Sequence, residues 1–212
     1  MGTANHSDAA PQRIDLSTLT PGFSDGVHDS QGVFRALLEA LSRPGTIVSI
    51  DAVLRDLRTQ GTVPLAVLAS LLALADYSTP VFLQHDDSSL SDAVRFHTGA
   101  PLTTDSKKAA FAYLHDAASM PSLDAFSLGD AETPENAATL FIRVESLENG
   151  PPLLWSGPGM PCPRAVCVAG LPDAFWRERA GLASKFPCGV DCYFVAGGAL
   201  IGLPRTTQVG VD

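Results

Sequence analysis

No long apolar run occurs in this 212-residue sequence. The longest, residues 64–75, has twelve residues, whereas a membrane-spanning helix needs about 20. It is therefore predicted to be a buried segment, and no membrane partner is expected. The first seven residues lack both the basic start and the apolar core of a secretory signal. A cytoplasmic location is expected.

Positive charge is also scarce. The sequence has 14 lysine and arginine residues against 23 aspartate and glutamate residues, giving a formal net charge of -9. The field of such a protein repels polyanions, and no basic stripe opposes it, so nucleic acid is not an expected partner. The same field disfavours a bound nucleotide or phosphonate unless a few arginines are focused on it.

Stand-alone catalytic motifs are absent as well. The sequence has no Gly-x-Ser-x-Gly elbow and no metalloprotease histidine pattern, and its glycine-rich stretch at residues 156–161 lacks the Gly-Lys-Ser/Thr ending of a phosphate loop. That stretch is predicted to be a tight turn after a strand, and no catalytic residue is predicted.

The four cysteines form two pairs, Cys162 with Cys167 and Cys188 with Cys192. Their gaps of four and three residues do not match the two-residue gap of zinc knuckles and redox motifs. We expect reduced, at least partly buried thiols, and neither a metal site nor a disulfide.

Residues 1–24 are rich in Ser, Thr, Asp, Pro and Gly. This composition cannot offset the entropy lost on ordering, so a flexible N-terminal tail is predicted, followed by a single domain over residues 25–212. An amphipathic helix opens the domain, because apolar residues recur at helical spacing as far as Pro44 and Gly45. These are Phe34, Leu37, Leu38 and Leu41.

Further periodic segments alternate between helix and strand. Strands are predicted at residues 46–50, 80–83, 110–114, 140–147, 190–196 and 199–203, and helices at residues 65–75, 89–98 and 172–184. Residues 65–75 are apolar on every side, as in a helix covered by sheet and neighbouring helices or by a second subunit. The alternation predicts an α/β layered domain with a mixed β-sheet.

Three of these segments carry finer predictions. Ser89 and Asp92 resemble a capping box at the start of a helix. The strand at residues 140–147 alternates so that one of its sides is expected to face water. Gly197-Gly198 between two apolar runs is typical of a β-hairpin turn.

Pro204-Arg205-Thr206-Thr207 at the end of the last predicted strand is the most informative local signal. Arg205 followed by the hydroxyls of Thr206 and Thr207 can bind phosphate or phosphonate oxygens. The alternative is an edge strand in which Arg205 points to water and the threonines follow β propensity. Composition alone favours the alternative.

His97 shares a predicted helix face with Leu90 and Val94. It is interpreted either as a hydrogen-bonded structural histidine or, less simply, as a functional one. Arg95 beside it is a second ligand or interface candidate, although Asp92 three residues earlier is an ordinary helical partner. His85 adjoins Asp86 and Asp87 in a predicted polar loop, where surface residues are commoner than metal ligands.

With these segments in place, the sequence resembles the family of carbon-phosphorus lyase H subunits. The matching stretches occur in the family's order and cover nearly the whole chain outside the tail. They are Phe34-Arg35-Ala36-Leu37-Leu38, Ser42-Arg43-Pro44-Gly45, Leu72-Ala73-Leu74-Ala75-Asp76, Thr79-Pro80-Val81, Arg95-Phe96-His97-Thr98, Ala100-Pro101-Leu102, Gly129, Pro134-Glu135, Ala138-Thr139-Leu140, Phe186-Pro187, Gly189-Val190-Asp191 and Pro204-Arg205-Thr206-Thr207.

The resemblance implies a fold similar to the large domain of pyridoxal-phosphate (PLP)-dependent transferases, without PLP, and a homodimer. The residues agree on the cofactor, because a PLP enzyme needs a positioned Schiff-base lysine. The three lysines, Lys107, Lys108 and Lys185, lie in a predicted polar turn or at the end of a helix. No cofactor is expected.

The resemblance also implies a place in phosphonate catabolism under phosphate starvation. Family members assemble with the G, I and J subunits, and act with the G, I and L subunits in transferring ribose triphosphate from ATP to an alkylphosphonate. A non-catalytic, structural role is expected. The alternative is a stand-alone homodimer or enzyme that binds a phosphonate or nucleotide through Arg205 and its threonines. Retained PLP-dependent transferase activity is a third, less favoured alternative.

Overall fold

A computed structural model of the chain describes residues 19–210 apart from residues 52, 55 and 60. Residues 1–18 of the predicted tail lie outside the described residues. Within the rest of that segment, Thr20 contacts helix α3 (Ser88–Thr98). The buried Thr20 has its hydroxyl 2.7 Å from the hydroxyl of Ser89 and its carbonyl oxygen 2.9 Å from Nε2 of His97.

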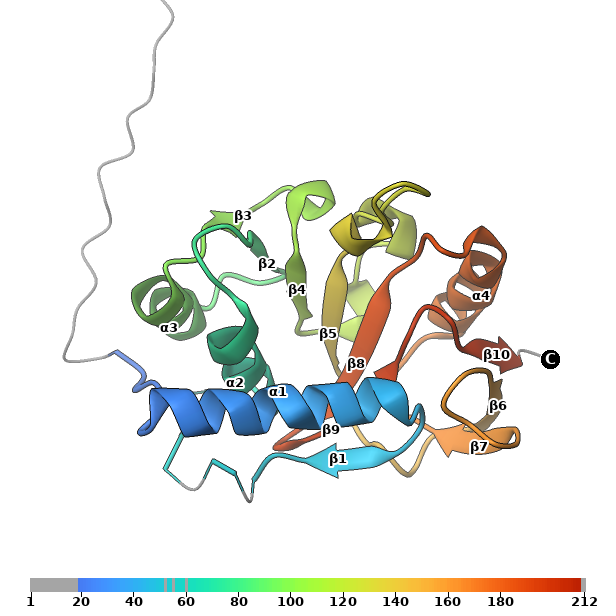
Figure 1. The fold of residues 1–212 in the computed structure, drawn as a ribbon, viewed down its shortest axis with the longest axis horizontal. Helices are drawn as coiled ribbons and strands as arrows, with labels where there is room; N and C mark the ends of the chain where they lie inside the picture. The colour runs from blue at the N-terminus through green and yellow to red at the C-terminus, as the bar shows by residue number, and fades with distance from the viewer. Residues whose placement is uncertain (1–18, 52, 55, 60, 211–212) are drawn as a thin grey trace, which may run out of the picture.

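A seven-stranded mixed sheet forms the centre of the molecule, in the order β1-β9-β8-β5-β4-β2-β3 (Figure 1). Strands β3, β2, β4, β5 and β8 run parallel, whereas β9 is antiparallel to both β8 and β1. The predicted α/β domain with a mixed sheet is confirmed. The strands are β1 Ile47–Ser49, β2 Val81–Leu83, β3 Leu102–Thr103, β4 Phe111–Leu114, β5 Thr139–Arg143, β8 Asp191–Ala196 and β9 Ala199–Leu203.

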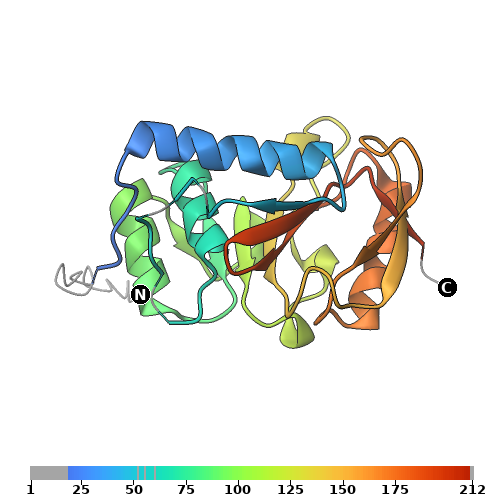
Figure 2. The same ribbon diagram turned by 90° about the horizontal axis from the view of Figure 1, so that it is seen from below.

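Both faces of this sheet are covered, and the sheet divides the core in two. Helices α1, α2 and α3 pack on one face, and α4 packs on the other with a small sheet of order β10-β6-β7 (Figures 1 and 2). The remaining bounds are α1 Gly26–Ser42, α2 Leu65–Leu74, α4 Asp173–Leu182, β6 Pro152–Ser156, β7 Arg164–Cys167 and β10 Gln208–Gly210, with short 3-10 turns at Ser106–Lys108, Ala117–Ser119, Leu123–Ala125, Pro134–Asn136 and Ala183–Lys185.

Strand β5 corrects the prediction that one of its sides faces water. Phe141 belongs to the core beneath α1, α2 and α3, while Leu140 and Ile142 belong to the core on the α4 side. All three are fully buried, because β5 lies between β4 and β8 in a sheet that is covered on both faces. Alternation of residue types along a central strand therefore does not mark a solvent-facing side.

Helix α1 confirms the predicted amphipathic helix but turns a different face to the core. Its buried residues are Val33, Ala36, Leu37 and Ala40. A Cβ added to Gly202 of β9 would lie 2.5 Å from the carbonyl oxygen of Ala40, so helix and strand backbones are almost in contact. Only small side chains fit there, and Phe34 and Leu38 are left 47% and 51% exposed.

Helix α2 is buried within this chain, packed against α1, α3 and β8. The sequence left open whether this helix is covered by the sheet and neighbouring helices or by a second subunit. The structure shows the first arrangement. No helix in the described part of the chain is both long and apolar enough to cross a membrane.

Two local predictions have opposite outcomes. The Gly197-Gly198 hairpin is confirmed, because β8 and β9 pair antiparallel on either side of it. The predicted capping box is wrong: α3 begins one residue earlier than Ser89, and Asp87 caps it by accepting a 3.0 Å hydrogen bond from the backbone N–H of Leu90.

Candidate functional site

The carboxyl ends of the parallel strands meet along one edge of the sheet, here called the carboxyl edge. The chain enters the parallel part at β2, adds β3 on one side and then places β4, β5 and β8 on the other (Figure 1). The order therefore reverses between β2 and β4. In open α/β sheets, ligands bind in the crevice at such a switch point.

The side chain of Gln84, which directly follows β2, joins the two sides of this switch point. Its Nε2 donates to the carbonyl oxygen of Asp116 (2.9 Å), and its Oε1 accepts from the backbone N–H of Asp116 (2.8 Å). These bonds extend the pairing of β2 with β4 past the strand ends. They bring His85 beside His115, with ring centroids 5.3 Å apart and planes at 82°.

Arg143 ends the neighbouring strand β5 and completes this cluster. Its Nη1 lies 3.5 Å from Nδ1 and 3.4 Å from Nε2 of His115, almost equidistant from the two ring nitrogens. The hydroxyl of Tyr113 approaches Nδ1 of the same ring at 3.4 Å. Within residues 19–210, excluding 52, 55 and 60, no carboxylate forms an ion pair with Arg143.

Burial, and then the charges of Arg143 and His85, lower the pKa of His115, and Asp116 and Asp87 oppose the shift. His115 is therefore uncharged at neutral pH. Burial raises the pKa of Tyr113 to about 12, so its hydroxyl keeps its proton. The cluster thus combines one fixed positive charge with neutral groups that can donate hydrogen bonds.

His115→Gln is expected to make stability less sensitive to acid. Because the pKa of His115 is lower in the folded protein than in the unfolded chain, the unfolded chain takes up a proton first as the pH falls below about 6.5. Folding stability then declines with falling pH, and the variant lacks this contribution. Urea unfolding at a series of pH values would measure it. Parallel stability curves for the wild type and the variant would contradict the assignment.

Three hollows lie along the carboxyl edge, and Arg143 lines two of them. One, of about 330 Å³, also contains His115, Asp116, Glu145 and Gly170. The second, of about 390 Å³, extends from Arg143 and Glu145 to the hairpin glycines at residues 197 and 198. Hollows of this size hold small ligands.

The third hollow, of about 550 Å³, lies between α3 and β3 and is lined by His85, Asp86, Asp92 and Arg95. The predicted candidate Arg95 is exposed there. His97, further along α3, is also exposed, and its imidazole holds the N-terminal segment through Thr20. That contact supports the structural interpretation of His97.

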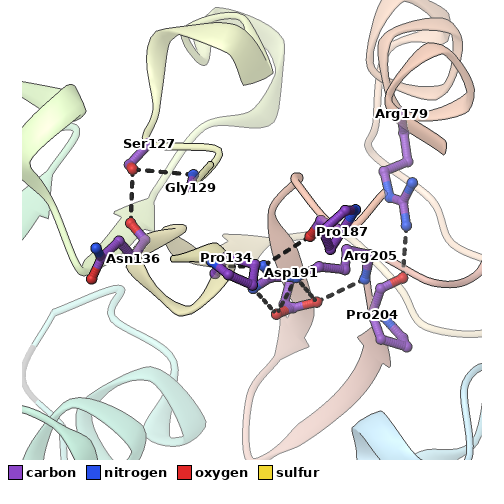
Figure 3. A network of polar contacts seen from close by, with 9 residues as sticks. All are labelled: Ser127, Gly129, Pro134, Asn136, Arg179, Pro187, Asp191, Pro204 and Arg205. Carbon is purple, nitrogen blue, oxygen red and sulfur yellow. Dashed lines mark hydrogen bonds and ion pairs between the residues drawn. The ribbon is translucent and has the colours of Figure 1, made fainter. Parts of the chain in front are cut away.

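Arg205 lies at the opposite end of the sheet and is occupied by internal partners (Figure 3). Its Nη2 lies 2.6 Å from Oδ2 of Asp191, and its Nη1 donates to the carbonyl oxygen of Pro134 at 2.6 Å. The side chains of Arg205 and Asp191 are only 17% and 18% exposed. The predicted alternative, in which Arg205 points to water, is wrong.

Thr206 and Thr207 lie in the connection between β9 and β10. Thr207 is buried, and its carbonyl oxygen accepts a 3.1 Å hydrogen bond from Nη2 of Arg179, which also donates to the carbonyl oxygen of Pro204. Thr206 is half-buried. Arg205, Thr206 and Thr207 therefore lie apart from Arg95 and His97. Arg205 has a structural role, because it binds Asp191 and the carbonyl oxygen of Pro134.

Sequence reasoning missed His115 and Arg143, although a signal for them was present. His115 directly follows the predicted strand at residues 110–114, and Arg143 interrupts an apolar run within the strand predicted at 140–147. Polar residues at the carboxyl ends of buried parallel strands are the usual candidates for ligand contacts.

The cysteines and lysines, which were considered for metal and cofactor binding, do not form such a site among the described residues. Cys162 is exposed, contrary to the prediction, whereas Cys192 is buried. In the described part of the chain, no three His, Cys, Asp or Glu residues are grouped closely enough to hold a metal ion. The ammonium group of Lys107 donates to the backbone carbonyls of Asp124 and Phe126, and Lys108 pairs with Asp105 at 3.5 Å.

Comparison with known proteins gives a consistent result over nearly the whole chain. Residues 21–210 match the family described as bacterial phosphonate metabolism protein (PhnH). The chain is 36% identical over 189 residues to the alpha-D-ribose 1-methylphosphonate 5-triphosphate synthase subunit PhnH of Rhizobium meliloti (strain 1021), covering 88% of this chain and 93% of that protein. It is 37% identical over 84 residues to a putative C-P lyase subunit protein HtxG of Stutzerimonas stutzeri, covering 40% of this chain and 43% of the relative. The chain therefore belongs to the PhnH family of bacterial phosphonate metabolism proteins.

Proposed function

We propose that this chain is an interaction subunit of a carbon-phosphorus lyase core complex and assembles with the G, I and J subunits. In this role it is required, together with the G, I and L subunits, for transfer of ribose triphosphate from ATP to an alkylphosphonate. Its relatives are named as subunits of a ribose 1-methylphosphonate 5-triphosphate synthase and of a C-P lyase. A subunit needs a surface that loses contact with water on assembly.

The outer side of α1 is the observation that carries this role. Val27, Phe34 and Leu38 are 63%, 47% and 51% exposed. They recur at spacings of seven and four residues, so they lie on one side of the helix and are here called the outer row. The inner side of the same helix is fully used in the core. Large apolar side chains gathered on one exposed helix face favour a protein partner, here another subunit of the complex.

Co-purification tests this role and its surface together. The tagged chain would be co-expressed with the G, I and J subunits of its own organism, followed by affinity purification and native mass determination. The wild type is expected to co-purify with them. Phe34→Glu combined with Leu38→Glu is expected to reduce recovery of the partners at least roughly tenfold, because two charges would be buried in an apolar contact.

A matched control is available outside the outer row. Tyr77 is 83% exposed and lies beyond the end of α2, so Tyr77→Glu adds an acid in place of an exposed aromatic without touching α1. It is expected to leave assembly unchanged. If the G, I and J subunits assembled without this chain, the subunit role would fail. If the outer-row variant assembled as well as the wild type, a different surface would make the contact.

Several finer features accompany this role. We infer a homodimer in isolation, a cytoplasmic location, expression under phosphate starvation and a non-catalytic contribution. The fold likeness to PLP-dependent transferases, without PLP, also stays a prediction.

The second candidate function is direct binding of a phosphonate or nucleotide by this chain. The route first considered, through Arg205, has little support because Asp191 and the carbonyl oxygen of Pro134 occupy its guanidinium. Arg143 favours a different location for it, since its half-buried guanidinium has no carboxylate partner within the described residues and lines two hollows.

A further inference from the structure

The charge of Arg143 is free to act on a ligand. Two of the neighbouring carboxylates, those of Asp116 and Asp87, are engaged locally. Asp116 accepts hydrogen bonds from the hydroxyl of Ser119 at 2.6 Å and from the backbone N–H of Ala118 at 3.0 Å. Asp87 caps helix α3. Arg143 is half-buried and has no paired acid among the described residues. Its partly desolvated charge is therefore uncompensated, and an anionic ligand would compensate it.

The groups around Arg143 point to the shape of that anion. Its Nη1 lies almost equidistant from both ring nitrogens of His115, and the ring of His85 stands at 82° to that of His115. The nitrogens of these groups therefore do not share a plane. A flat carboxylate uses donors in one plane, whereas the three oxygens of a tetrahedral group need donors from several directions.

We propose that Arg143, His115 and His85 form a binding site for a phosphate or phosphonate group at the carboxyl edge, at the switch point between β2 and β4. The guanidinium of Arg143 pairs with two oxygens, and the imidazole N–H groups of the two histidines donate to the remaining one. The 330 Å³ hollow beside His115 receives the substituent on phosphorus.

Nearby acids set the strength of this site. Glu145 and Asp116 line the same hollow, and Asp86 lies beside His85 in the adjacent one. Their charges oppose that of Arg143, so the isolated chain is expected to bind in the millimolar range. The site deepens the second candidate function, direct binding by this chain, and is independent of the subunit role, because it is tested on the isolated chain whereas the subunit role is tested by assembly.

The test follows the histidine resonances of the full-length chain by NMR while inorganic phosphate or methylphosphonate is added. Saturable shifts are expected for His115 and His85, identified with His115→Gln and His85→Gln, and not for the exposed His28. Arg143→Gln is expected to weaken binding at least roughly tenfold through loss of a charge-assisted pair. Arg43→Gln, which makes the same charge change at the end of α1, is expected to leave it unchanged.

Tighter binding of methylphosphonate assigns the site to phosphonates, tighter binding of inorganic phosphate assigns it to phosphate, and equal affinity assigns it to the shared tetrahedral group. Absence of saturable shifts at His115 and His85 in the wild type overturns the site, and this measurement does not depend on whether a variant folds. Equal weakening by Arg143→Gln and Arg43→Gln also overturns it, because the effect would then be one of net charge.

Discussion

Arg205→Ala is expected to lower the free energy of unfolding by about 3 to 5 kcal/mol, the usual cost of removing one partner from a buried ion pair. The loss is large because the carboxylate of Asp191 would stay in place, 18% exposed, without the Nε and Nη2 donors of Arg205, and would keep only the backbone N–H of residue 205 at 2.7 Å. The carbonyl oxygen of Pro134 would lose its donor as well. Urea unfolding followed by circular dichroism would measure the change.

Arg43→Ala is the matched control for this prediction. Arg43 pairs with Glu39 at 3.2 Å, but both side chains are at least half exposed. An exposed pair four residues apart on a helix contributes less than about 0.5 kcal/mol. If both variants lost the same amount of stability, burial would not distinguish the two pairs, and the structural task assigned to Arg205 would be wrong.

The elements set by local pattern could be predicted from the sequence. The strand and helix periodicities, together with Gly197-Gly198, place most of the major elements correctly, because apolar spacing and turn residues act over a few neighbouring positions. Strands β3, β7 and β10 were not predicted, and β6 was expected only as an unbounded strand before the turn at residues 156–161. β1 and β2 are as short but carry adjacent large apolar residues, whereas β3 and β10 each hold a single one and cannot be distinguished from loops.

Contacts between distant segments account for what the sequence did not show. Pro204-Arg205-Thr206-Thr207 has the residue types of an anion site, but the acid that occupies Arg205 lies at the start of β8, 14 residues earlier. His115 and Arg143 are 28 residues apart and meet only because β4 and β5 are neighbours in the sheet. Strand order, which depends on the whole fold, therefore separates the unoccupied arginine from the occupied one.

Gly202→Ala is the second substitution with a large expected effect, a loss of about 2 to 3 kcal/mol. The added Cβ would lie 2.5 Å from the carbonyl oxygen of Ala40 and 2.8 Å from the backbone nitrogen of Leu41. These are backbone atoms of a 17-residue helix, so no flexible side chain can move aside. Either α1 shifts away from β9 or the strand bends, and both reduce the contact that buries Val33 and Leu37.

Gly181→Ala provides the contrast within the same protein, because a Cβ added there meets nothing within 4 Å and the residue is exposed in α4. That variant is expected to gain about 0.5 kcal/mol by restricting the unfolded chain. Urea unfolding of both variants would measure the difference in sign, and equal effects would contradict the close approach of α1 to β9. Since a displaced α1 also moves Phe34 and Leu38, Gly202→Ala is expected to reduce co-purification with the partner subunits even under conditions in which the variant remains folded, whereas Gly181→Ala leaves assembly intact.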